Sequence, residues 1–133
     1  MSKSIKSKPF LIIGRARAGL GLFASRPIKR GQRIIEYTGE IISGAAADRK
    51  GGRYLFEVSR NTVIDGTARK NLARYLNHSC RPNCYAEIDG QRVFIFAKRN
   101  IPIGEELAYH YGREYFNDFI RPNGCRCQAC HGK

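Results

Sequence analysis

Short apolar runs alternate with glycine along the first third of the chain. Leu11–Ile13 is followed by Gly19–Gly21, and Ile34–Tyr37 comes after a further polar interval. Runs of this length, rich in β-branched residues and bounded by glycine, predict strands joined by turns. The same pattern predicts later strands over residues 54–58, 62–66 and 93–97.

One segment has the spacing of a helix. Leu72, Tyr75 and Leu76 stand at i, i+3 and i+4, so we predict a helix over residues 68–76. Residues 44–52 are small and polar, with a short helical turn expected at 45–49. Short strands with little helix indicate a β-rich α+β fold.

Length and composition limit the class of protein. A chain of 133 residues suits one domain with its own core, and 42% hydrophobic residues indicate a globular chain. No run approaches the roughly 20 apolar residues that span a bilayer. The apolar run Phe10–Ile13 is shorter than the roughly 7–15 residues of a secretory signal. We therefore expect a cytoplasmic protein with no membrane partner, or one that reaches the nucleus or chromatin of a host cell.

The formal net charge of +13 favours an acidic partner, most often nucleic acid or an anionic surface. A basic protein with no such partner would have the same charge. Charge alone therefore leaves both interpretations open.

Three of the five cysteines lie close together near the C-terminus, as Cys125-x-Cys127-x-x-Cys130. An odd count, clustered at one end, does not suit a disulfide framework. Three thiolates at this spacing suit tetrahedral zinc, for which a fourth ligand has to come from elsewhere. Cys84 and His131 are two candidates, and three reduced surface thiols are the alternative to a metal site.

Two further runs concentrate reactive side chains. Arg74–Cys84 contains an amide, an imidazole, a hydroxyl and a thiol in succession at Asn77–Cys80. Glu106–Gly112 contains Tyr109 and Tyr111, which share a face if the segment is a strand. Taken alone, the Asn-His pair is more often a helix end, and two such tyrosines are more often part of a half-buried strand.

Together with four other segments, these two runs resemble the SET-domain family of protein-lysine methyltransferases. The four others are Gly19–Ala24, Glu36–Glu40, Tyr54–Phe56 and Ile64–Asn71. The resemblance implies a SET-domain fold over residues 10–112, with several small β-sheets and a knot-like crossing. It also implies a zinc-binding post-SET segment over residues 113–133. Residues 1–9 are basic, and we expect them to be flexible.

The resemblance implies transfer of a methyl group from S-adenosylmethionine to a lysine amine of a protein substrate. That lysine would lie in an extended segment of a histone or another nucleic-acid-associated protein. The implied catalytic residues are Tyr111, Tyr54 and Tyr109. A tyrosine at position 109 implies a bias toward monomethylation, because its hydroxyl occupies space beside the amine.

The implied cofactor-binding residues are Gly19, Leu20, Gly21, Arg74, Asn77 and His78. The implied zinc ligands are Cys80, Cys125, Cys127 and Cys130, since the family's post-SET segment shares its metal with the cysteine of the Asn-His-Ser-Cys run.

A non-enzymatic, zinc-stabilised module that binds nucleic acid is the alternative function. It explains the charge and the cysteines, but it gives no role to Tyr54, the Asn-His pair and the two later tyrosines. A SET fold kept only for binding is a third hypothesis, although every implied catalytic position holds a competent residue. The substrate protein, the target lysine and the oligomeric state are not predicted.

Overall fold

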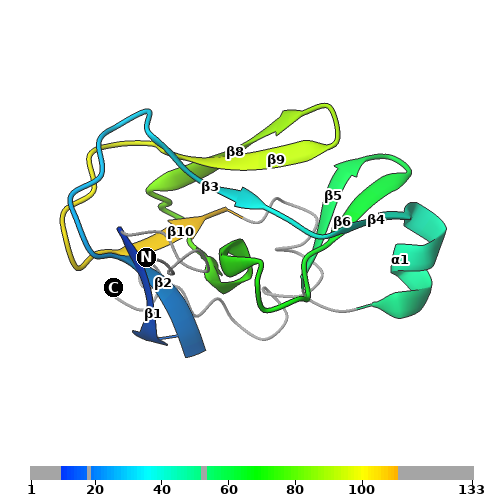
Figure 1. Cartoon of the computed structure of the whole chain (residues 1–133), viewed down its shortest axis with the longest axis horizontal. Helices are drawn as coiled ribbons and strands as arrows, with labels where there is room; N and C mark the ends of the chain where they lie inside the picture. The colour runs from blue at the N-terminus through cyan, green and yellow to red at the C-terminus, as the bar shows by residue number, and fades with distance from the viewer. Residues whose placement is uncertain (1–9, 18, 52–53, 111–133) are drawn as a thin grey trace, which may run out of the picture.

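The strands of the chain form three small sheets in a computed structural model that describes residues 10–17, 19–51 and 54–110 (Figure 1). One sheet has the order β1-β2-β10-β7, and the other two have the orders β3-β9-β8 and β4-β6-β5. The strands are β1 Leu11–Ala16, β2 Gly19–Ala24, β3 Arg33–Tyr37, β4 Glu40–Ser43, β5 Leu55–Ser59, β6 Thr62–Asp65, β7 Asn77–His78, β8 Cys84–Asp89, β9 Arg92–Ala97 and β10 Glu106–Tyr109. The expected β-rich fold of several small sheets is confirmed.

Three of these strands, β4, β7 and β8, were not predicted as strands. All three are edge strands of their sheets. In β8 Cys84 is buried and Ala86 is half-buried, and the other four residues are exposed, so the apolar pattern is too short to predict a strand. The turn that joins β8 to β9 is tight, because Asp89 pairs with Arg92 and Gly90 has a φ of 65°.

The predicted helix over residues 68–76 is wrong. Only the single 3₁₀ turn Leu72–Tyr75 forms there. The buried side chain of Asn71 donates to the Gly66 carbonyl at 3.0 Å and accepts from the Thr38 amide at 3.0 Å, which holds Asn71 itself in an extended conformation. Leu76 is still buried, as the apolar spacing required, and the chain then enters β7.

The helical turn expected near residues 45–49 is confirmed as α1, Gly44–Lys50. The Ser43 hydroxyl caps it by accepting from the Ala46 amide at 3.0 Å. Lys50 in its last turn pairs with Asp65 of β6, which ties α1 to the sheet. Among the described residues, no helix is long and apolar enough to cross a membrane.

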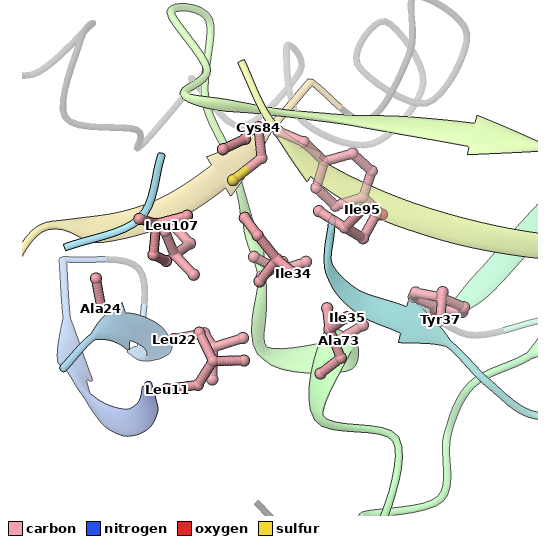
Figure 2. Close-up of a cluster of buried hydrophobic side chains, with 14 of the residues drawn as sticks. Leu11, Leu22, Ala24, Ile34, Ile35, Tyr37, Ala73, Cys84, Ile95 and Leu107 are labelled. Atoms are coloured by element: carbon pink, nitrogen blue, oxygen red, sulfur yellow. The ribbon is translucent and has the colours of Figure 1, made fainter. Parts of the chain in front are cut away.

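A single hydrophobic core lies where the first two sheets face each other (Figure 2). Leu22 of β2, Ile34 of β3, Ile95 of β9 and Leu107 of β10 are each 0% exposed. Burial of a side chain of this size stabilises a fold by roughly 1.5–3 kcal/mol. The core therefore fixes β2, which carries the predicted residues Gly19, Leu20 and Gly21, and β10, which carries Tyr109.

Candidate active site

The four-stranded sheet brings together three segments that are distant in sequence. Strand β10 pairs with β2 in the antiparallel sense, with Leu107 opposite Leu22. On its other side β10 pairs with β7 in the parallel sense, with Ala108 beside Asn77 and Tyr109 beside His78. The predicted cofactor-binding segments and one predicted catalytic tyrosine therefore share a sheet.

Asn77 is held by β2 and β10 at once. Its Nδ2 donates to the Leu20 carbonyl at 3.0 Å and to Glu106 Oε2 at 2.8 Å. A Cβ on Gly21 would lie 2.7 Å from Glu106 Oε2, 2.9 Å from Ala16 Cβ and 3.2 Å from Asn77 Nδ2, so a side chain at position 21 would displace Glu106 and crowd β1. Glu106 was not predicted as a site residue, because nothing in the sequence spacing pairs it with Asn77.

Asn83 fastens the Asn-His-Ser-Cys run to β10. Its side chain is 4% exposed, and its Oδ1 accepts from the Ala108 amide at 2.9 Å. Its Nδ2 donates to the Glu106 carbonyl and to Glu105 Oε2, both at 2.8 Å. Sequence reasoning missed this role, since an asparagine after a proline is usually part of a turn.

Arg74 has an unsatisfied buried donor. Its guanidinium lies 4.2 Å from the centre of the Tyr54 ring and 5.2 Å from that of Tyr75. Its Nε is buried and has no hydrogen-bond partner in the part of the chain described. Because buried polar groups are nearly always paired, this N–H indicates a place for a ligand that accepts a hydrogen bond. The predicted residues Tyr54 and Arg74 thus lie in contact.

An aromatic series leads from the core to Tyr109. The Tyr37 and Phe56 ring centres are 5.3 Å apart, and the Phe56 and Tyr109 rings are stacked with centres 6.4 Å apart. Phe56 and Tyr109 line a pocket of about 280 Å³ with His110. Phe56 was not predicted as a site residue, although it stands two positions after Tyr54 and so shares its face on an extended chain.

His78 is a neutral imidazole at pH 7. Burial, followed by the nearby His110 ring at 4.5 Å, lowers the pKa of His78 to about 4. Its Nε2 lies 3.5 Å from the sulfur of Cys80. The side chain therefore offers hydrogen-bonding groups without a charge.

The two described cysteines of the motif differ sharply. Cys80 is exposed, whereas Cys84 is 1% exposed in the core, where burial raises its pKa to about 12 (Figure 2). A thiol that stays protonated is a poor metal ligand, because metals bind the thiolate. Within residues 10–17, 19–51 and 54–110, no group of three metal-ligating side chains occurs. The remaining predicted site residues, Tyr111, Cys125, Cys127 and Cys130, lie outside the described residues, as does His131.

Comparison with known proteins agrees with this arrangement. The family model for the SET domain matches residues 19–112. This chain belongs to the SET-domain family. The SET domain found here is 39% identical over 142 residues to the H3 lysine-4 specific histone-lysine N-methyltransferase of Aspergillus oryzae, a match that covers 96% of this chain and 12% of that protein. It is 42% identical over 123 residues to histone-lysine N-methyltransferase set1 of Dictyostelium discoideum, covering 83% of this chain and 8% of that protein.

A solved structure has the same fold. The polycomb repressive complex 2 of Chaetomium thermophilum contains a chain with a TM-score of 0.68 and 30% identity to this SET domain. The match covers 77% of this chain and 15% of that one. The relatives are thus several times longer than the SET domain described here.

Proposed function

We propose that this SET domain is a protein-lysine N-methyltransferase that takes its methyl group from S-adenosylmethionine. The observation that carries the proposal is the pairing of β7 with β10, which puts His78 directly beside Tyr109 and Asn77 beside the preceding Ala108. The two relatives named above, both histone-lysine N-methyltransferases, support the same activity. Histones or other nucleic-acid-associated proteins are accordingly the proposed substrates.

The proposed cofactor-binding residues suit a ligand that carries a carboxylate. The free Nε–H of Arg74 is a charge-assisted donor of the kind that binds carboxylates. The main chain of Gly19, Leu20 and Gly21 and the side chains of Asn77 and His78 would hold the rest of the molecule. When bound, S-adenosylmethionine supplies a methyl group attached to a positively charged sulfur.

The aromatic pocket would prepare the lysine. A free lysine has a pKa near 10.4, so at neutral pH it is protonated and has no lone pair with which to attack. Phe56 and Tyr109 line the pocket and carry no carboxylate, and removal of the lysine from water there would favour the neutral amine. The hydroxyls of Tyr111 and Tyr54 would then orient that amine, so that positioning supplies most of the acceleration.

Tyr109 is the proposed determinant of product. Its hydroxyl would occupy the space that a second methyl group needs, so we expect transfer to stop at one methyl. The Tyr109→Phe variant should instead produce di- and trimethyllysine, which intact-mass measurement of the substrate distinguishes. A wild-type enzyme that already makes trimethyllysine contradicts this role.

A zinc site shared by Cys80, Cys125, Cys127 and Cys130 is proposed to order residues 113–133 as a post-SET segment. Cys80 is the proposed motif ligand because it is exposed, whereas Cys84 lies in the core. The zinc content of the purified chain should fall in Cys80→Ala and stay unchanged in folded Cys84→Ala. The reverse result would assign the ligand to Cys84.

The test of the activity is mass spectrometry of histones incubated with the chain and S-adenosylmethionine, in parallel with Tyr111→Phe. The expected result is methylated lysine with wild type and little or none with the variant. Cofactor affinity measured by titration calorimetry in Arg74→Lys tests the binding site separately, because lysine keeps the charge but lacks the Nε–H. If wild type neither methylates a lysine nor binds the cofactor, the non-enzymatic nucleic-acid-binding function replaces the proposal.

A further inference from the structure

Two loops are joined into one rigid surface at the end of the molecule opposite α1. They are residues 25–32 between β2 and β3 and residues 98–105 between β9 and β10, at the left of Figure 1. Ile28 and Ile101 exchange both main-chain hydrogen bonds, at 2.9 and 2.8 Å, and each side chain is 1% exposed. The Arg30 amide also donates to Asn100 Oδ1 at 2.8 Å. The side chains on these loops are therefore presented by a fixed backbone.

The exposed side chains of these loops, together with Arg33 at the start of β3, are strongly basic. We call the following residues the basic end: Arg26, Lys29, Arg30, Arg33, Lys98 and Arg99. All six are exposed, and the acidic residue within the two loops is Glu105, which bonds Arg99. Among the described residues, Arg26, Lys29 and Arg30 have no ion-pair partner.

Several acidic residues are paired or lie away from the basic end. Glu36 is within electrostatic reach of Arg33 but is paired with Arg92 in a two-bond contact, and Asp65 is paired with Lys50 near α1. Glu87 and Asp89 lie on β8, whose far end turns into β9 at Gly90. Part of the net charge of +13 is therefore concentrated on one preorganised surface with little acid to offset it.

We propose that the basic end binds the phosphate backbone of a nucleic acid. Four of its six residues are arginines, whose planar guanidinium matches phosphate oxygens with two parallel bonds. Neither loop contains an aromatic residue, whereas protein interfaces are enriched in aromatic anchors. Ile103 is the large exposed apolar residue of the loops, which is too little for insertion into a membrane surface.

The location is also useful for the proposed function. Histones are themselves basic and would be repelled by a chain of charge +13, unless a polyanion lies between the two. The loop 98–105 continues directly into β10, which carries Tyr109. Nucleic acid on the basic end would therefore hold its associated proteins near the proposed lysine pocket. This advantage rests on the proposed function, whereas the binding itself does not.

The test compares two variants that each lose three positive charges. Arg26→Gln/Lys29→Gln/Arg30→Gln alters the basic end, and Arg49→Gln/Arg60→Gln/Arg69→Gln is the matched control at α1, the β5–β6 turn and the loop after β6. Affinity for a 20-base-pair DNA duplex is measured by fluorescence anisotropy between about 50 and 200 mM salt. Each phosphate contact contributes about −0.9 to the slope of log K against log salt, so the first variant should reduce the slope by about 2.7. The control should reduce it by less than one.

Three results would overturn the proposal. The first is an equal loss in both variants, which would mean diffuse attraction by the whole charge. The second is wild-type binding to polyglutamate, or to vesicles with anionic headgroups, that matches binding to duplex or single-stranded nucleic acid. The third is unchanged duplex affinity in the basic-end variant, when its thermal unfolding shows that it is folded like wild type.

The assay contains no methyl donor, so its outcome does not depend on catalysis. Where the activity is also present, the basic-end variant should methylate a free histone peptide normally and nucleosomes more slowly.

Discussion

Replacement of Asn83 by alanine tests whether one buried amide holds the site together. The side chain accepts from the Ala108 amide and donates to the Glu106 carbonyl and to Glu105. Alanine would leave the first two main-chain groups without partners where little water reaches, since Asn83 is 4% exposed. Glu105 would keep its contact with Arg99 and so contributes little to the loss.

The expected cost follows from those two main-chain groups. Each buried group left unsatisfied costs roughly 1–3 kcal/mol, so Asn83→Ala should lower the free energy of unfolding by about 2–6 kcal/mol. For a domain of this size, that is a fall in Tm of roughly 6–24 °C. Because the same bonds hold β10 against the chain that follows β7, affinity for S-adenosylmethionine should fall as well.

Urea unfolding monitored by circular dichroism measures the first quantity, and titration calorimetry measures the second. The matched control is Asn100→Ala, which removes an exposed asparagine that also accepts from a main-chain amide, that of Arg30. We expect a cost below about 1 kcal/mol there, since water replaces the lost partner. If the two variants lose equal stability, the reasoning about a buried clamp is refuted.

Two further predictions concern other parts of the fold. Gly21→Ala would crowd Glu106 and Ala16 and shift Asn77, so we expect roughly 10- to 100-fold lower kcat/KM, and wild-type kinetics would refute the need for glycine. The pKa of Asp65 is lowered, first by its hydrogen bond from Lys50 and then by that from Thr67. The stabilisation that Asp65 provides is therefore present above the unfolded pKa near 3.9 and is lost as the pH falls through the lower folded pKa. Asp65→Asn should therefore reduce Tm at pH 7, and the difference from wild type should disappear in strong acid; a difference that is constant with pH would argue against the ion pair.

The sequence predicts the strands of this fold better than the segments that connect them. Apolar runs such as Ile34–Tyr37 identify buried strands because burial is a local property of the pattern. The segment 68–76 was misassigned because Asn71 bonds to Thr38 and Gly66, and a long-range contact of one side chain leaves no periodic signal. The predicted helix spacing was real, but it described which residues face the core and not the backbone conformation.

The site shows the same division. Asn77, His78 and Tyr109 were identified from a motif whose order along the chain is specific, and the structure places them on adjacent strands. Glu106 and Asn83 were missed, since their roles depend on partners that only the folded sheet brings near. Sequence reasoning thus found the residues proposed to touch ligands and missed those that position them.

Strand β10 is the element on which the proposed chemistry depends most. One edge of β10 pairs with β2 and the other edge pairs with β7, so the main-chain hydrogen bonds of β10 hold the cofactor-binding segments near Tyr109. A slip of one residue in either pairing would turn Tyr109 away from Phe56 and bring Ala108 or His110 in its place. Register is therefore the physical reason that Asn83, with bonds to both Glu106 and Ala108, should matter to activity although it is proposed to touch no substrate.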